Sequence, residues 1–170
     1  MMPTITQPLR DEHRELVPHI DALRTVADGV GDVPLVETRR GLDEAYLFLT
    51  RHLIPHAQAE DAALYPVVAQ AMGAPEATAT MSRDHAAVGQ LVDELATLRQ
   101  EIGTSGLDHS GERSLRCVLY GLYALIRVHF TKEEEIYLPL LDDRLSAEDA
   151  AEMFEAMDQA GRRAQGISPP

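Results

Sequence analysis

The sequence of 170 residues has one cysteine, few basic residues and no long hydrophobic run. A single cysteine, Cys117, cannot form an internal disulfide, so nothing indicates a disulfide-stabilised secreted domain. No apolar segment approaches the roughly 20 residues that a membrane span needs. The first residues, MMPTITQPLRDEH, lack the basic and then apolar layout of a secretory signal. These absences predict a cytoplasmic protein without a membrane segment.

Positive charge is also scarce. The chain has 15 Lys and Arg against 28 Asp and Glu, a formal net charge of −13. Nucleic acids and anionic membranes are bound through basic patches. We therefore expect neither as a partner, while a protein partner stays open.

Alternating apolar and polar residues, the signal of a half-buried strand, do not form any sustained run. Apolar residues instead recur at steps of three and four, which predicts amphipathic helices. Four long helices joined by short connections predict an all-α fold, an antiparallel up-down four-helix bundle with a short C-terminal extra helix. The first predicted helix begins near residues 6–8 and ends before Gly29. The following helices are predicted to cover about 36–72, 78–102, 112–142 and 147–165.

The predicted organisation is one domain with short appendages. It consists of an N-terminal lead-in (1–7), the bundle (8–145), a C-terminal helix (146–165) and a disordered tail (166–170). Cys117 is expected to be a buried small hydrophobe. His109 is expected in a polar loop over residues 103–111.

Proline occurs where a regular helix should not tolerate it. Pro55 lies directly before His56, Pro66 lies later in the same predicted helix, and Pro18 lies in the first. A proline inside a helix removes a hydrogen bond and clashes with the preceding turn. We expect kinks at Pro18 and Pro66, and a distorted turn beside His56.

Two segments share a pattern. Residues 56–66 read HAQAEDAALYP and residues 129–139 read HFTKEEEIYLP, each with a histidine, a glutamate four residues later and a proline six after that. Positions i and i+4 lie on one face of a helix, so each segment points an imidazole and a carboxylate the same way. Another histidine precedes each motif at nearly equal distance, 43 residues for His13 and 44 for His85.

All of these residues lie on the apolar stripes of the predicted helices. Buried histidine and glutamate are costly unless they are paired or bind a metal. The bland alternative is a metal-free helical interaction module with satisfied core histidines. Convergence inside one bundle favours a metal centre instead, with these ligands: His13, His56, Glu60, His85, His129 and Glu133.

Four imidazoles and two carboxylates suit a transition metal better than calcium or magnesium. Six ligands exceed the four of a structural zinc ion. The duplicated pattern favours two metal ions, each held by two histidines and bridged by Glu60 and Glu133. An oxo or hydroxo bridge from solvent would add a donor and leave room for an outside ligand. These donor atoms are compatible with iron, manganese or zinc.

The motifs Asp11-Glu12-His13, His56-x-x-x-Glu60 with Leu64-Tyr65-Pro66, Asp84-His85, and His129-x-x-x-Glu133 with Tyr137-Leu138-Pro139 together resemble the hemerythrin-like (HHE cation-binding) domain, bacterial type, over about residues 8–142. The resemblance implies a bundle holding a non-haem di-iron centre that binds O2, and in relatives H2O2 or NO. It also implies the same six ligands.

Two positions differ from the oxygen-carrying members. Gly89 stands where they have another histidine, and Glu133 follows His129 by four residues rather than an aspartate by five. A missing ligand implies a more open centre, which favours reaction with peroxide or NO over plain oxygen carriage. We therefore expect a small oxidant as partner, with catalase-like peroxide removal as one role. The alternative is iron or gas sensing or storage without turnover.

Several residues near the motifs could support the site. His52, one turn before His56, could replace the missing ligand, or support a ligand or pack beside it. Tyr65 and Tyr137 could orient ligands or line access to the centre, or simply pack at the bundle end. Asp11 and Asp84 could accept hydrogen bonds from imidazoles, or lie on the surface.

Overall fold

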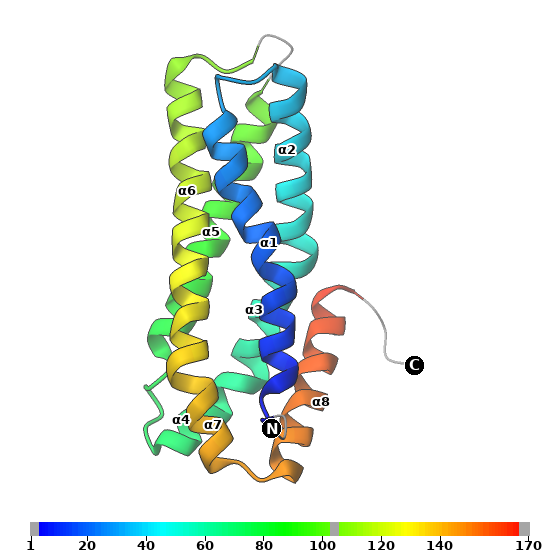
Figure 1. The fold of residues 1–170 in the computed structure, drawn as a ribbon, viewed down its shortest axis with the longest axis vertical. Helices are drawn as coiled ribbons and strands as arrows, with labels where there is room; N and C mark the ends of the chain where they lie inside the picture. Colours follow the sequence, from blue (N-terminus) through cyan, green and yellow to red (C-terminus); the bar gives the residue numbers. More distant parts are fainter. Residues whose placement is uncertain (1–3, 103–105, 167–170) are drawn as a thin grey trace.

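The structure is a computed structural model that describes residues 4–102 and 106–166. Every regular element in this part of the chain is helical, and it contains no strand (Figure 1). The predicted all-α fold is therefore confirmed. The predicted tail lies outside the described residues, apart from Gly166.

The helices form long stretches that lie side by side, with a last helix packed against the lower half (Figure 1). The first stretch is α1 (Gln7–Gly29) and the third is α5 (Ala79–Glu101). The second and fourth are each interrupted by π-helical turns, labelled η, and the last helix is α8. The second stretch consists of α2 (Leu35–Phe48), η1 (Leu49–Leu53), α3 (Ile54–Ala59), η2 (Glu60–Leu64) and α4 (Tyr65–Met72). The fourth stretch consists of α6 (His109–Lys132), η3 (Glu133–Tyr137) and α7 (Leu138–Arg144), and α8 covers Ala147–Ala164.

Each π turn ends shortly before a proline. Pro55, Pro66 and Pro139 each lie at the start of the α-helical segment that follows the turn. A proline cannot donate a hydrogen bond and its ring crowds the carbonyl four residues earlier, so a wider turn relieves the conflict. The expected distortion beside His56 is present. By contrast, α1 continues as one α-helix through Pro18, with no π turn.

The helix ends follow local capping chemistry. The Asp108 side chain accepts a hydrogen bond from the Gly111 amide at 2.8 Å, so α6 starts at His109 and not near residue 112 as predicted. His109 is therefore in the helix, although it is exposed as expected of a loop residue. Of the predicted loop, residues 106–108 have no regular secondary structure and residues 103–105 lie outside the described residues. The Ser146 hydroxyl and the Asp149 carboxylate form a capping box that starts α8 where predicted.

The expectation for Cys117 was wrong, because its side chain is exposed. Leu115 and Leu119 are buried in the same helix. A residue two positions from Leu115 is turned about 200° around the helix axis, which places it on the solvent side.

Two apolar clusters make up the core, and the predicted ligands lie between them. In α1, Leu9 belongs to the lower cluster and Leu16 to the upper one, with His13 between. The same order holds in α5, where Met81 and Val88 flank His85. The hydrophobic core is thus split by one polar layer.

The last helix covers the part of the bundle that carries this layer. α8 packs on α3 and η2, and its buried face contains small or flexible apolar side chains. They are Ala150, Met153, Met157 and Ala160. Within the described residues, no helix is long and apolar enough to cross a membrane.

Candidate metal centre

The six predicted ligands converge at the polar layer. Glu60 and Glu133 have no exposed surface, and the three histidines His13, His56 and His129 are at most 6% exposed. The side chain of His85 is 9% exposed. These residues come from all four long stretches, so the layer depends on the whole bundle.

The first histidine pair, His13 and His56, faces the carboxylates with its Nε2 atoms. His56 Nε2 lies 3.0 Å from Glu60 Oε1, and His13 Nε2 lies 3.6 Å from the same oxygen. His13 Nε2 is also 3.4 Å from Glu133 Oε2. The three atoms of His13, His56 and Glu60 are close enough to share one metal ion.

The second histidine pair, His85 and His129, uses the other carboxylate oxygens. His85 Nε2 lies 3.3 Å from Glu60 Oε2, and His129 Nε2 lies 3.3 Å from Glu133 Oε1. Glu60, His85 and His129 form a second group that could hold an ion. Each glutamate therefore places one oxygen toward each pair, as a bridging ligand would.

The buried atoms at the centre lack the hydrogen bonds that burial requires. Among the described residues, no hydrogen-bond partner is present for Nε2 of His13 and His56, for either oxygen of Glu60, or for Oε2 of Glu133. Their close approaches fail the geometry of a hydrogen bond. Uncompensated burial of such atoms costs roughly 1–3 kcal/mol each. A shared cation removes this cost, so the residues fit a metal.

Four further carboxylates fix the orientation of the imidazoles. They accept hydrogen bonds from the four Nδ1 atoms, leaving each Nε2 toward the centre. The pairs are His13 with Glu134 (2.9 Å), His56 with Glu12 (3.0 Å), His85 with Asp61 (3.0 Å) and His129 with Asp84 (3.1 Å). We call Glu12, Asp61, Asp84 and Glu134 the supporting carboxylates.

This orientation strengthens the argument for a cation. With both Nδ1 atoms donating to carboxylates, the neutral rings of His85 and His129 turn lone pairs toward each other. Their Nε2 atoms are 3.0 Å apart. Lone pairs at that distance repel, and only a positive charge between or on them removes the repulsion.

Three of the supporting carboxylates are themselves held by a further polar group. Arg10 Nη1 lies 2.6 Å from Glu134 Oε2, Lys132 contacts Asp84, and Ser82 Oγ donates to Asp61 at 2.6 Å. Among the described residues, Glu12 bonds to His56 alone, and its side chain is 49% exposed. Glu12 is therefore the least restrained of the four.

The carboxylates favour positive charge at the histidines. Burial lowers the pKa of His56, but Glu60 and Glu12 outweigh it and bring that pKa well above its ordinary value. Burial likewise opposes protonation of His85, yet Asp61 and Glu60 raise its pKa to about 9. Burial also raises the pKa of Glu60, but His56 and His13 bring it well below the usual range. The centre thus favours cations, whether protons or metal ions.

The two motif tyrosines have different positions. The hydroxyl of Tyr65 donates to Glu133 Oε1 at 2.7 Å and lies 3.0 Å from His129 Nε2 and 3.3 Å from His85 Nε2. Burial and the two glutamates raise the pKa of Tyr65, so it stays a neutral phenol. The Tyr137 hydroxyl instead donates to the Ala77 carbonyl at 3.4 Å, away from the centre.

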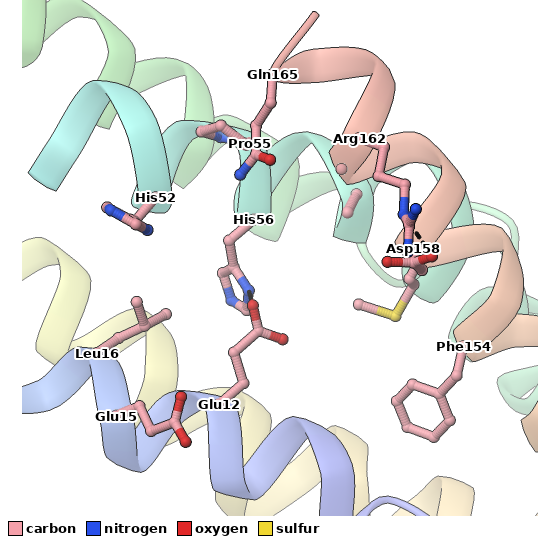
Figure 2. A pocket seen from close by; sticks show the side chains of 13 residues that line it. Glu12, Glu15, Leu16, His52, Pro55, His56, Phe154, Asp158, Arg162 and Gln165 are labelled. Carbon is pink, nitrogen blue, oxygen red and sulfur yellow. Dashed lines mark hydrogen bonds and ion pairs between the residues drawn. The ribbon is translucent and has the colours of Figure 1, made fainter. Parts of the chain in front are cut away.

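Other predicted residues lie outside the centre. His52 is exposed and its ring lies 6.4 Å from that of Phe48; it lines a surface pocket (Figure 2) and is not part of either group of converging atoms. Asp11 is exposed and contacts Gln7 and Arg14. Its neighbour Glu12 makes the imidazole contact instead.

Sequence reasoning missed Glu12, Asp61 and Glu134 as supports. It also missed Phe130, whose ring stacks on His13 with centroids 4.1 Å apart. A signal was present in the duplicated pattern. An acid precedes each upstream histidine (Glu12, Asp84), and an acid follows each motif glutamate (Asp61, Glu134).

Comparison with known proteins agrees with this geometry. The family model described as "Hemerythrin HHE cation binding domain" matches residues 4–141, which include every predicted ligand. Neither the curated proteins nor the solved structures gave a match. The match spans most of the chain and leaves out α8. The chain therefore belongs to the hemerythrin HHE cation-binding domain family.

Proposed function

We propose that this protein holds two iron ions, one at each histidine pair, and uses them to bind or react with a small oxidant such as O2, H2O2 or NO. The observation that carries the proposal is that Glu60 and Glu133 each direct one oxygen toward each pair, with buried atoms that lack other partners. Family membership supports metal binding and typically iron.

In this proposal His13, His56, His85, His129, Glu60 and Glu133 are the ligands. We infer that they are carried by an antiparallel up-down four-helix bundle, which the short connections between successive helices support. The supporting carboxylates hold the imidazoles in the tautomer that directs Nε2 inward.

Bound iron would supply a redox-active Lewis acid for the small molecule. The chain supplies the rest. The apolar clusters on both sides keep bulk water from the layer, and Phe130 fixes the ring of His13 by stacking. The Tyr65 hydroxyl restrains Glu133 by donating a hydrogen bond to its Oε1 atom. The same hydroxyl lies beside the Nε2 atoms of His85 and His129. Catalase-like peroxide removal is the turnover that we propose.

The test is the metal content of aerobically purified protein, read with its ultraviolet-visible spectrum before and after peroxide is added. We expect two irons per chain, charge-transfer bands that respond to peroxide, and oxygen evolution. One zinc ion or no metal, with a spectrum that iron reconstitution leaves featureless, would contradict the di-iron proposal.

A second function, metal or gas sensing without turnover, is favoured by one observation. α8 packs directly on η2, the turn that begins with Glu60, so the state of the centre can be transmitted to that helix. A large melting shift on iron binding, with no oxygen evolved from peroxide, would support sensing or storage.

A further inference from the structure

A pocket of about 370 Å³ lies between α1, α3 and α8, next to one side of the centre (Figure 2). Its inner wall includes His56 and Ala59, one helical turn or less from Glu60. Its outer wall is provided by α8, through Phe154, Met157 and Gly161. The pocket is large enough for a molecule of several atoms, and far larger than one water.

Of the four histidine–carboxylate pairs, only Glu12–His56 lines this pocket. Figure 2 shows the two side chains meeting across it. Because Glu12 is half exposed and has no second partner in the described chain, its side chain can move once its hydrogen bond to His56 is broken. The wall beside His56 is thus the part of the layer that opens most easily.

The wall from α8 has no side chain at Gly161. A glycine inside a helix costs about 1 kcal/mol relative to alanine. A Cβ atom at this position would meet only Ala59 Cβ, at 3.9 Å, so packing does not demand a glycine. The absence of a side chain keeps the pocket open toward α3.

The pocket is lined by two carboxylates with no Lys or Arg to balance them in the described part of the chain, although the imidazole of His56 lies beside one of them, Glu12. Asp158 and Arg162 form an ion pair at 2.9 Å, so their charges largely cancel. Glu12 and Glu15 remain, and neither has a Lys or Arg partner in the described part of the chain. Carboxylates that line a narrow approach repel anions and leave uncharged molecules unaffected.

Building on the proposed function, we propose that this pocket is the entrance through which a small uncharged ligand reaches the His13–His56 side of the centre. Glu12 and Glu15 select against anions at this entrance. Because α8 lies outside the family match, the outer wall of this entrance is a feature of this chain's own C-terminal helix.

The first test narrows the entrance without touching a ligand. Gly161→Leu, with Gly161→Met as a more flexible second variant, places a side chain in the pocket. Gly161→Ala is the matched backbone control, and Ala156→Leu places the same leucine side chain in a different pocket lined by α8. The measurement is the association rate of NO and of azide with the iron-loaded protein, followed by absorbance, together with metal content.

We expect Gly161→Leu and Gly161→Met to slow association of both molecules by about tenfold or more at unchanged metal content. Both controls should keep the wild-type rates. Wild-type rates in both Gly161 variants would overturn the entrance. Absence of bound metal in the wild-type protein would instead reject the proposed function, so the two failures are distinguishable.

The second test addresses charge. Glu15→Gln keeps the size of the side chain and removes its charge. We expect azide, an anion, to associate about threefold faster or more, while the rate for uncharged NO stays the same. An equal change in both rates, or no change for azide, would overturn the selection against anions.

Discussion

The centre has two halves, the His13–His56 pair and the His85–His129 pair. They use the same residue types as ligands but differ in the residues that surround those ligands. Both have two histidines and two supporting carboxylates, and the two halves share Glu60 and Glu133. The second half also has the Tyr65 hydroxyl among His85, His129 and Glu133. The first half has instead the Phe130 ring on His13, and a pocket beside His56.

This difference shows that a repeated motif can produce a symmetric set of ligands and an asymmetric site. Tyr65 follows its motif histidine by nine residues and Tyr137 follows its own by eight, so Leu138 occupies the position that matches Tyr65, and only Tyr65 reaches the centre. One half is closed by a polar group and the other opens toward a pocket. We therefore expect the first half to be where outside molecules arrive.

The largest effect should come from the shared glutamates. Glu60 faces His13, His56 and His85, while Glu133 faces His13 and His129. We expect Glu60→Ala to reduce iron in both halves, to less than one ion per chain. Glu133→Ala should retain more metal, because Glu133 faces one histidine in each half, whereas Glu60 faces three histidines in all. Metal analysis after gel filtration measures both, and full iron loading of Glu133→Ala with an unchanged spectrum would contradict its role as a bridge.

The supporting carboxylates should give the next largest effect. Replacing such a group typically lowers metal affinity by about 10- to 100-fold. We expect Asp84→Asn to lie near the upper end, since Lys132 is then left beside His129. Glu12→Gln should lie near the lower end, because the flexible Glu12 contributes less orientation. Competition with a chelator gives the affinities, and equal losses would show that restraint of the carboxylate is unimportant.

The tyrosines provide a matched pair of variants. Tyr65→Phe leaves Glu133 Oε1 without its 2.7 Å hydrogen bond, so we expect the metal-free protein to lose about 1–3 kcal/mol of unfolding free energy. Tyr137→Phe loses a longer bond to a carbonyl and should cost at most about 1 kcal/mol. Urea unfolding compares the two. A smaller loss for Tyr65→Phe than for Tyr137→Phe would refute the asymmetry of the halves.

The smallest effect is the pH dependence of the metal-free protein. The pKa of His85 is raised to about 9 by Asp61 and Glu60 against the effect of burial, so its protonation stabilises the fold fully below about pH 6.5. That contribution is lost as pH rises through about 9. We expect roughly 1–2 kcal/mol less stability at pH 8 than at pH 6 from this residue. Asp61→Asn should flatten the dependence, as urea unfolding at several pH values would show.

Much of the architecture could be predicted from the sequence, because the period of apolar residues determines which helix faces are buried. The same stripes placed six polar residues inward, and the structure brings all six together. The predicted start of α6 was wrong because the Asp108 side chain caps the helix at an earlier residue. Asp108 lies among other polar residues, so the sequence does not single it out as the cap.

The surroundings of the ligands were harder to predict. The four supporting carboxylates lie one position from a ligand in sequence, and all four are at least partly exposed. Helical periodicity alone classes them as surface residues. Which histidine each acid contacts depends on how the stretches pack side by side. His52 lies in the π turn η1, which changes the helical phase between His52 and His56. The two tyrosines differ because their distances from the motif histidines differ by one residue, about 100° around the helix axis.

The supporting pairs also bear on how such a chain can be divided. The first two helical stretches form one hairpin and the next two form another. Glu12 and Asp84 each support a histidine of their own hairpin, whereas Asp61 and Glu134 each support a histidine of the other hairpin. A single helical hairpin would therefore leave one of its two histidines without support. Two copies of one hairpin, associated about a twofold axis, would complete every pair. The centre thus retains the contact pattern of a homodimer within one polypeptide, and two fragments separated at the loop around Gly73 should reassemble it.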